Sequence, residues 1–217
     1  LTIFDLENDS IINKFKLSYI LETVNFVNFN NQNIYLNHVV WSPCNKKLIT
    51  IFHYDDKFDR RRRIFPVLIN LQTFDVDLLL SNGYFSHHTF MDENRILAYI
   101  MLNNELCFAI WSKDNGWQRI YSSMPRLDGH PTYIKPLDKI VVDSYPNRFG
   151  VMSLYLGSST IHDKFEKIAR IRNPLNYVGP LRCDLHPRVS LDHGLIICDY
   201  PGKNGRKILI LKGVFDI

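Results

Sequence analysis

Four histidines occupy one recurring position in this chain. Each lies three residues before a large apolar residue, which is followed by an apolar stretch typical of a strand; the four are His38, His87, His130 and His186. The steps between them are 49, 43 and 56 residues, and a unit of about 40–50 residues built from short strands is typical of a β-propeller blade. Because blades repeat around an axis, the shared position predicts four imidazoles directed at one place.

Carboxylates recur beside two of these histidines. The run Asp128-Gly-His130-Pro131 matches Asp184-Leu-His186-Pro187, and Asp143 aligns with Asp199 further along the same two units. Neutral imidazole together with carboxylate suits Mn, Fe or Zn-like ions better than Ca or Mg. The pattern therefore predicts that three residues share one divalent metal ion: His130, Asp184 and His186.

Basic residues fall in loops expected on the same face as the histidines. A run of four arginines covers residues 60–63, and Arg148 and Arg182 lie near the third and fourth histidines. Arginine binds carboxylate or phosphate through two parallel hydrogen bonds, and a cationic rim concentrates a polyanion at the site. The residues expected to contact an anionic substrate are His38, Arg60, Arg61, Arg62, Asp143, Arg148, Arg182 and Asp199.

The elements that position these residues are predicted to be short strands, four to a blade. The sequence predicts an all-β fold, a single β-propeller domain with about four blades plus part of another. Residues 1–30 end a preceding blade, and the blades span residues 31–82, 83–126, 127–175 and 176–217, the last without its outer strand. The second strands are expected at Lys47–His53, Arg95–Leu102, Lys139–Ser144 and Leu195–Asp199. No stretch shows sustained 3.6-residue periodicity, so few helices are expected.

Composition narrows the class of protein. The chain has 217 residues, of which 46% are hydrophobic and 13% aromatic, as in a globular protein rich in strands. A net charge of +4 is too weak to indicate nucleic-acid binding, and no apolar run approaches the roughly 18 residues of a membrane helix. The four cysteines form no CxxC pair, which fits a reducing, cytoplasmic compartment. The chain starts at Leu1 with the last two strands of a blade, so we expect it to be part of a longer protein.

Structural explanations exist for each of these features. A histidine at the start of a blade can hydrogen-bond a turn or a neighbouring blade, and an Asp-x-His pair can cap a turn. Asp143 and Asp199 can cap strand ends, and the arginine run can be a solvated hairpin tip. Under these explanations the chain is a non-catalytic propeller whose rim binds a protein or an anionic polysaccharide.

The histidine pattern resembles the C-terminal part of oligogalacturonate lyase, a seven-bladed propeller that acts on short pectin fragments. That family also places a histidine at the start of four consecutive blades. The resemblance implies that His87 is the general base and that His130 and His186 bind a manganese-like ion, with Asp184 where the family has another ligand histidine. It also implies a catalytic arginine within the run 60–63, and Arg63 is assigned that role.

The chemistry that follows is elimination from a uronate. A metal ion on the uronate carboxylate makes the adjacent C–H proton more acidic, and an unprotonated histidine can remove that proton while the 4-linked sugar leaves. The predicted function is therefore a metal-dependent polysaccharide lyase, with manganese as cofactor and a short uronate oligosaccharide as substrate. Hydrolysis by paired carboxylates such as Asp143 and Asp199 is a further possibility.

Overall fold

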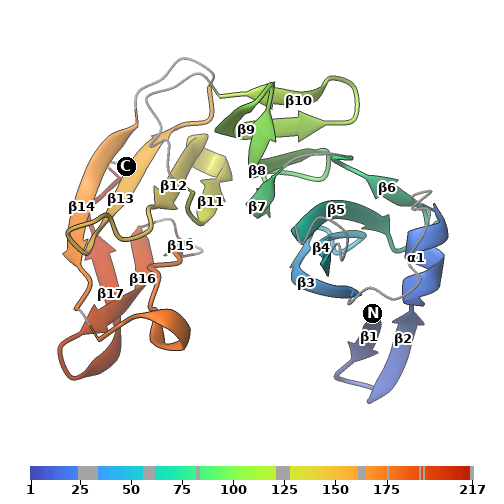
Figure 1. Ribbon diagram of the computed structural model, residues 1–217, viewed down its shortest axis with the longest axis horizontal. Helices are drawn as coiled ribbons and strands as arrows, with labels where there is room; N and C mark the ends of the chain where they lie inside the picture. Colours follow the sequence, from blue (N-terminus) through green and yellow to red (C-terminus); the bar gives the residue numbers. More distant parts are fainter. Residues whose placement is uncertain are drawn as a thin grey trace. The chain divides into compact units, whose positions relative to one another are not determined.

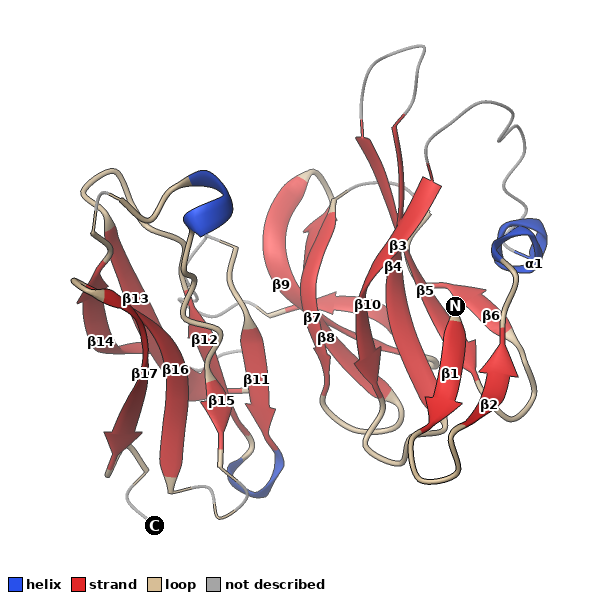
Figure 2. Cartoon of the chain, turned by 90° about the horizontal axis from the view of Figure 1, so that it is seen from below, coloured by secondary structure: helices blue, strands red, loops and turns tan. Residues whose placement is uncertain are grey.

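The computed structural model describes nine stretches of the chain, which carry seventeen strands and one α-helix. The described residues are 1–23, 34–55, 62–81, 84–120, 128–160, 165–174, 176–190, 192 and 194–215. Figure 2 shows that strands dominate these stretches, with the α-helix and two short 3₁₀ helices drawn in blue. The chain divides into two compact units, Leu1–Gly83 and Tyr84–Ile217. No helix in the described stretches is long and apolar enough to cross a membrane.

Unit 1 holds a hairpin, a helix and one four-stranded sheet (Figure 1). The hairpin is β1 (Thr2–Asp5) with β2 (Ser10–Lys14), and the helix is α1 (Leu17–Thr23). The sheet has the order β3-β4-β5-β6 and consists of β3 (Ile34–Trp41), β4 (Lys47–Asp55), β5 (Arg62–Asn70) and β6 (Val76–Leu78). Hairpin, helix and sheet share one apolar core, which includes Ile3, Phe15, Ile20 and Leu48.

Unit 2 holds three antiparallel sheets, each a meander in chain order (Figure 1). The first consists of β7 (Phe85–Phe90), β8 (Arg95–Leu102), β9 (Glu105–Ser112) and β10 (Gly116–Arg119). The second consists of β11 (Pro131–Ile134), β12 (Lys139–Asp143), β13 (Val151–Ser158) and β14 (Glu166–Arg172). The third consists of β15 (Arg188–Val189), β16 (Leu195–Gly202) and β17 (Gly205–Lys212). The first strands β7, β11 and β15 are neighbours, which brings the start of each sheet to one place.

The cores of unit 2 lie between successive sheets. One core joins Leu97 and Phe108 of the first sheet to Ile140 and Val142 of the second. Another joins Leu154 of the second sheet to residues of the third, including Ile196 and Leu209. The second strands β8 and β12 are buried on both faces, as Ile96–Ile100 of β8 show with no residue more than 3% exposed, whereas β16 is buried mainly on one face. Sheets stacked in this way, meeting at their first strands, are propeller blades.

The predicted all-β propeller fold is confirmed, down to the position of most strands. The predicted second strand Arg95–Leu102 coincides with β8, and the other three differ from β4, β12 and β16 only at their C-terminal ends. The fourth blade has three strands among the described residues. The sequence did not predict α1, because seven residues with Ile20 and Leu21 as their buried pair are too short to display a helical period.

Candidate functional site

Three of the four recurring histidines meet in unit 2. His87 lies in β7 at a β-bulge, because the pairing with β8 is interrupted between Phe85 and His88. His130 directly precedes β11, and His186 lies two residues before β15 with a left-handed backbone, φ of 42°. The ring centroids lie 4.0 Å apart for His87 and His130, and 4.1 Å apart for His130 and His186. The common register thus brings three imidazoles into one row.

A carboxylate lies behind each of the three rings. The distance from histidine Nδ1 to a carboxylate oxygen is 3.1 Å for His87 and Asp128, 3.0 Å for His130 and Asp143, and 3.0 Å for His186 and Asp199. An ionised carboxylate only accepts hydrogen bonds, so each Nδ1 carries the proton and each Nε2 is the acceptor nitrogen of its ring. Carboxylates in this position orient histidine ligands and raise their basicity.

Asp143 connects two of the histidines. It is 1% exposed, and its oxygens accept hydrogen bonds from the backbone N–H groups of His130 and His186 as well as from the His130 ring. Burial alone would raise the pKa of Asp143, but these hydrogen bonds outweigh it and hold the pKa below its ordinary value. The residue is therefore placed to orient both histidines from behind, whereas the sequence assigned it to substrate contact.

His130 is set to stay neutral. Its pKa is lowered by burial and by the neighbouring imidazoles His87 and His186, although Asp143 opposes this shift. Neutral imidazole is the form that binds a metal ion. The environment of His130 thus favours the ligand form around neutral pH.

Asp184 completes a group with metal-ligand spacing. Ligand atoms of His130, Asp184 and His186 all lie within 4.8 Å of one another. Asp184 Oδ2 accepts a hydrogen bond from Arg182 Nε at 2.9 Å and forms an ion pair with Arg182 Nη2 at 2.8 Å. Asp184 Oδ1 is buried and has no hydrogen-bond partner within the described part of the chain. A buried carboxylate oxygen without a partner is costly unless a cation or water satisfies it, so the donor set fits a divalent metal ion.

His87 stands outside that group and has a different partner. The Tyr145 hydroxyl lies 3.3 Å from His87 Nε2. On the other side of the ring, Asp128 accepts hydrogen bonds from the Ser86 and Tyr84 hydroxyls, at 2.7 Å and 3.0 Å. Burial would raise the pKa of Asp128, but its hydrogen bonds outweigh burial and lower it. Asp128 is therefore ionised at neutral pH and fixes the tautomer of His87.

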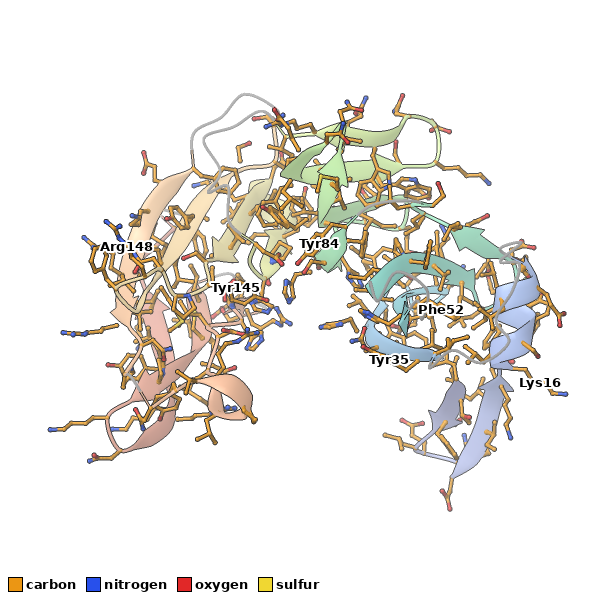
Figure 3. All side chains as sticks on the ribbon, viewed as in Figure 1. Lys16, Tyr35, Phe52, Tyr84, Tyr145 and Arg148 are labelled. Atoms are coloured by element: carbon orange, nitrogen blue, oxygen red, sulfur yellow. The ribbon has the colours of Figure 1, made fainter. Side chains whose placement is uncertain are left out.

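Tyr145 is held among the site residues. Its ring makes edge contacts with His87 and His130 at 5.8 Å between centroids in each case, and the Arg182 guanidinium carbon lies 4.6 Å above the ring. Burial, followed by the Asp128 charge, raises the pKa of Tyr145 well above its ordinary value. Figure 3 places Tyr145 on the inner side of unit 2. The phenol thus keeps its proton at neutral pH.

Of the other residues that the sequence predicted to contact substrate, some lie at the site and others lie elsewhere in the chain. Arg182 and Asp199 belong to the site, whereas Arg148 is exposed near the outer edge in Figure 3 and packs on Phe149. His38 belongs to unit 1, at a β-bulge in β3 with φ of 52°. Arg60 and Arg61 lie outside the described residues. Arg62 and Arg63 begin β5, and their side chains are not described.

The sequence did not single out the residues around His87. Asp128 and Asp184 occupy the same place in the repeated Asp-x-His-Pro run, yet Asp128 pairs with His87 of the preceding blade. The sequence nevertheless indicated that the carboxylate partner of His87 lies in a different position. His130 and His186 each have an aspartate 13 residues later, whereas His87 has Ile100 there, so its carboxylate had to come from elsewhere.

Comparison with known proteins shows the fold. No protein-family model and no curated protein sequence matches the chain. Among solved structures, TolB from Acinetobacter baumannii has a TM-score of 0.51 and 10% identity over 82% of this chain and 52% of its own. The β-propeller domain of the trilobed protease from Pyrococcus furiosus has a TM-score of 0.51 and 16% identity over 83% and 56%.

A third solved structure is also similar to this chain. Pyrococcus horikoshii acylaminoacyl peptidase has a TM-score of 0.52 and 15% identity over 99% of this chain and 34% of its own. The chain therefore spans about half or less of the length of these structures. At such low sequence identities the similarity to these structures shows the architecture of the chain but not its activity. The chain is a β-propeller.

Proposed function

We propose that the protein is a metal-dependent lyase that cleaves short uronate oligosaccharides by β-elimination. One observation carries the proposal: His130, His186 and the unpartnered oxygen of Asp184 have metal-ligand spacing beside a histidine, His87, that a carboxylate orients separately. Lyase chemistry needs these two parts together, a cation for the substrate carboxylate and a base for the proton next to it.

The proposed ligands are His130 and His186 through Nε2, and Asp184 through Oδ1. Two imidazoles and one carboxylate suit a manganese-, iron- or zinc-like ion. When bound, such an ion withdraws charge from a uronate carboxylate and makes the adjacent C–H proton more acidic. Asp143 and Asp199 hold the two rings from behind, as carboxylates commonly do for histidine ligands.

His87 is the proposed base. Its Nδ1 donates to ionised Asp128, so Nε2 is the nitrogen that takes up a proton, and Asp128 stabilises the imidazolium that forms. This is the arrangement in which a carboxylate directs a histidine base in nucleophilic triads. His87 is not one of the three residues with metal-ligand spacing, so the proposal assigns it the role of base and not that of a ligand.

Arg182 supports an anionic substrate. Its side chain is 50% exposed while Asp184 and the face of Tyr145 hold it at the site. A guanidinium fixed in this way presents its remaining N–H groups to a second carboxylate. The similarity of the histidine pattern to oligogalacturonate lyase supports a uronate as the substrate class.

The test is an elimination assay with the full-length protein, manganese and a panel of uronate oligosaccharides. Ultraviolet absorbance of the unsaturated product should rise with wild type and stop on adding chelator, reversibly. His87→Ala should lose about 10²–10⁴ in rate, whereas Arg148→Ala, a control outside the site, should retain activity. A wild type that binds metal but forms no unsaturated sugar from any uronate would contradict the proposed chemistry.

A further inference from the structure

Hydrogen bonds in the adjacent turn and contacts with three side chains hold Tyr145 in place. It follows β12, and the next turn is closed by the bonds from Asn147 N to Val151 O, at 3.0 Å, and from Ser144 N to Ser153 O, at 2.9 Å. The Ser144 hydroxyl also accepts the Ser153 backbone N–H at 3.1 Å. With His87, His130 and Arg182 against its ring, the phenol has a fixed direction.

That direction is toward the proposed base. The Tyr145 hydroxyl donates to His87 Nε2 over 3.3 Å, and this is the nitrogen to which the proposed function assigns removal of the substrate proton. The hydroxyl and Nε2 are therefore close enough for one substrate ring to lie against both.

We propose that Tyr145 is a catalytic residue that protonates the departing sugar, and that the enzyme acts on 4-linked uronates whose C5 hydrogen and O4 lie on the same face of the ring. This inference rests on the proposed lyase function and specifies its substrate. Uronates of the gluco and manno configurations meet the condition, whereas in galacturonate the C5 hydrogen and O4 lie on opposite faces.

The distance between the Tyr145 oxygen and His87 Nε2 supports this substrate class. An acid and a base each act from hydrogen-bond reach, about 3 Å from the atom they serve. On opposite faces of a sugar ring they would be separated by the ring itself and could not hydrogen-bond each other, but the Tyr145 oxygen and His87 Nε2 are 3.3 Å apart. The geometry therefore fits removal and delivery of protons on one face.

The proton balance closes without another reactant. His87 Nε2 takes the C5 hydrogen as a proton, the C4–C5 double bond forms and the C4–O4 bond breaks. The departing O4 takes the proton of the Tyr145 hydroxyl. The phenolate then recovers a proton from His87 Nε2 through their hydrogen bond, so both residues return to their starting forms.

The experiment compares substrates and a matched pair of variants in the full-length protein with manganese. Wild type should release unsaturated product from oligomannuronate or a 4-linked glucuronate oligomer at least about tenfold faster than from oligogalacturonate of equal length. Tyr145→Phe keeps the ring and should lower kcat by about 10²–10⁴, with KM and bound manganese unchanged. Tyr133→Phe, which removes a hydroxyl that donates to Asp138 and neighbours Arg95, should leave kcat unchanged.

The outcomes separate this inference from the proposed function. Preference for oligogalacturonate, or full kcat in Tyr145→Phe, would overturn the inference while leaving a lyase. Loss of bound manganese in Tyr145→Phe would mean a structural role and would also overturn it. If wild type forms no unsaturated product from any uronate, the proposed function fails first.

Discussion

Each site histidine owes its chemical state to the aspartate behind it. Asp128, Asp143 and Asp199 place the proton of their partner on Nδ1, and this leaves three Nε2 atoms as bases or ligands. The protonation state that the proposed chemistry requires is thus set by carboxylates that need not touch the substrate.

Asp143→Asn should destabilise the fold and remove a pH dependence. The carboxylate is buried and accepts two backbone N–H groups and one ring N–H, and leaving such groups poorly paired costs about 1–3 kcal/mol. The pKa of Asp143 is lowered in the folded state. Its stabilisation is therefore present above pH 3.8 and is lost as the pH falls through the lowered folded-state pKa.

Urea unfolding with chelator present, from pH 7 down to pH 3, measures this effect. The difference in unfolding free energy between wild type and Asp143→Asn should shrink as the solution becomes more acidic. Asp77→Asn, at an exposed position, should behave like wild type throughout. A constant difference across the pH range would show that ionised Asp143 is not the stabilising form.

Among the elements, the tightest packing at the site surrounds Gly129. A Cβ atom at this position would lie 1.9 Å from the Asp143 backbone oxygen and 3.0 Å from its Oδ1. Gly129→Ala must push β12 away from the segment before β11, and overpacking of this kind costs about 1–3 kcal/mol. Thermal unfolding should show a lowered Tm, with weaker manganese binding because Asp143 is displaced. Gly194→Ala has its nearest contact at 3.8 Å and should unfold like wild type; equal Tm values for the two variants would contradict the packing argument.

The strands were predictable because each blade repeats the same buried second strand, as at Lys47, Arg95, Lys139 and Leu195 where these strands begin. The ligand group His130, Asp184 and His186 followed from the same repeat. The partner of His87 did not, because pairing between Asp128 and a histidine 41 residues earlier depends on how two blades pack. The role of Tyr145 was not predicted either, because the recurrence of Tyr145-Pro146 as Tyr200-Pro201 does not show where the side chain points.

For the molecule as a whole, unit 2 contains a histidine row and its carboxylates, while His38 and the arginine run belong to unit 1. The net charge is +4, and electrostatic attraction of an anionic substrate weakens as salt screens it. KM for a uronate oligosaccharide should therefore rise several-fold between low and high salt, with kcat nearly constant. Steady-state kinetics in increasing sodium chloride measure this, and a KM that does not change with salt would argue against charge-assisted binding.

The central claim is that His130, Asp184 and His186 hold one divalent metal ion. The most direct measurement is elemental analysis of the full-length protein after equilibration with manganese and removal of free ion. We expect about one ion per chain in wild type and in Arg148→Ala, and none in His130→Ala when its folding is confirmed by circular dichroism. Wild type without bound metal, or undiminished metal in folded His130→Ala, would contradict the account.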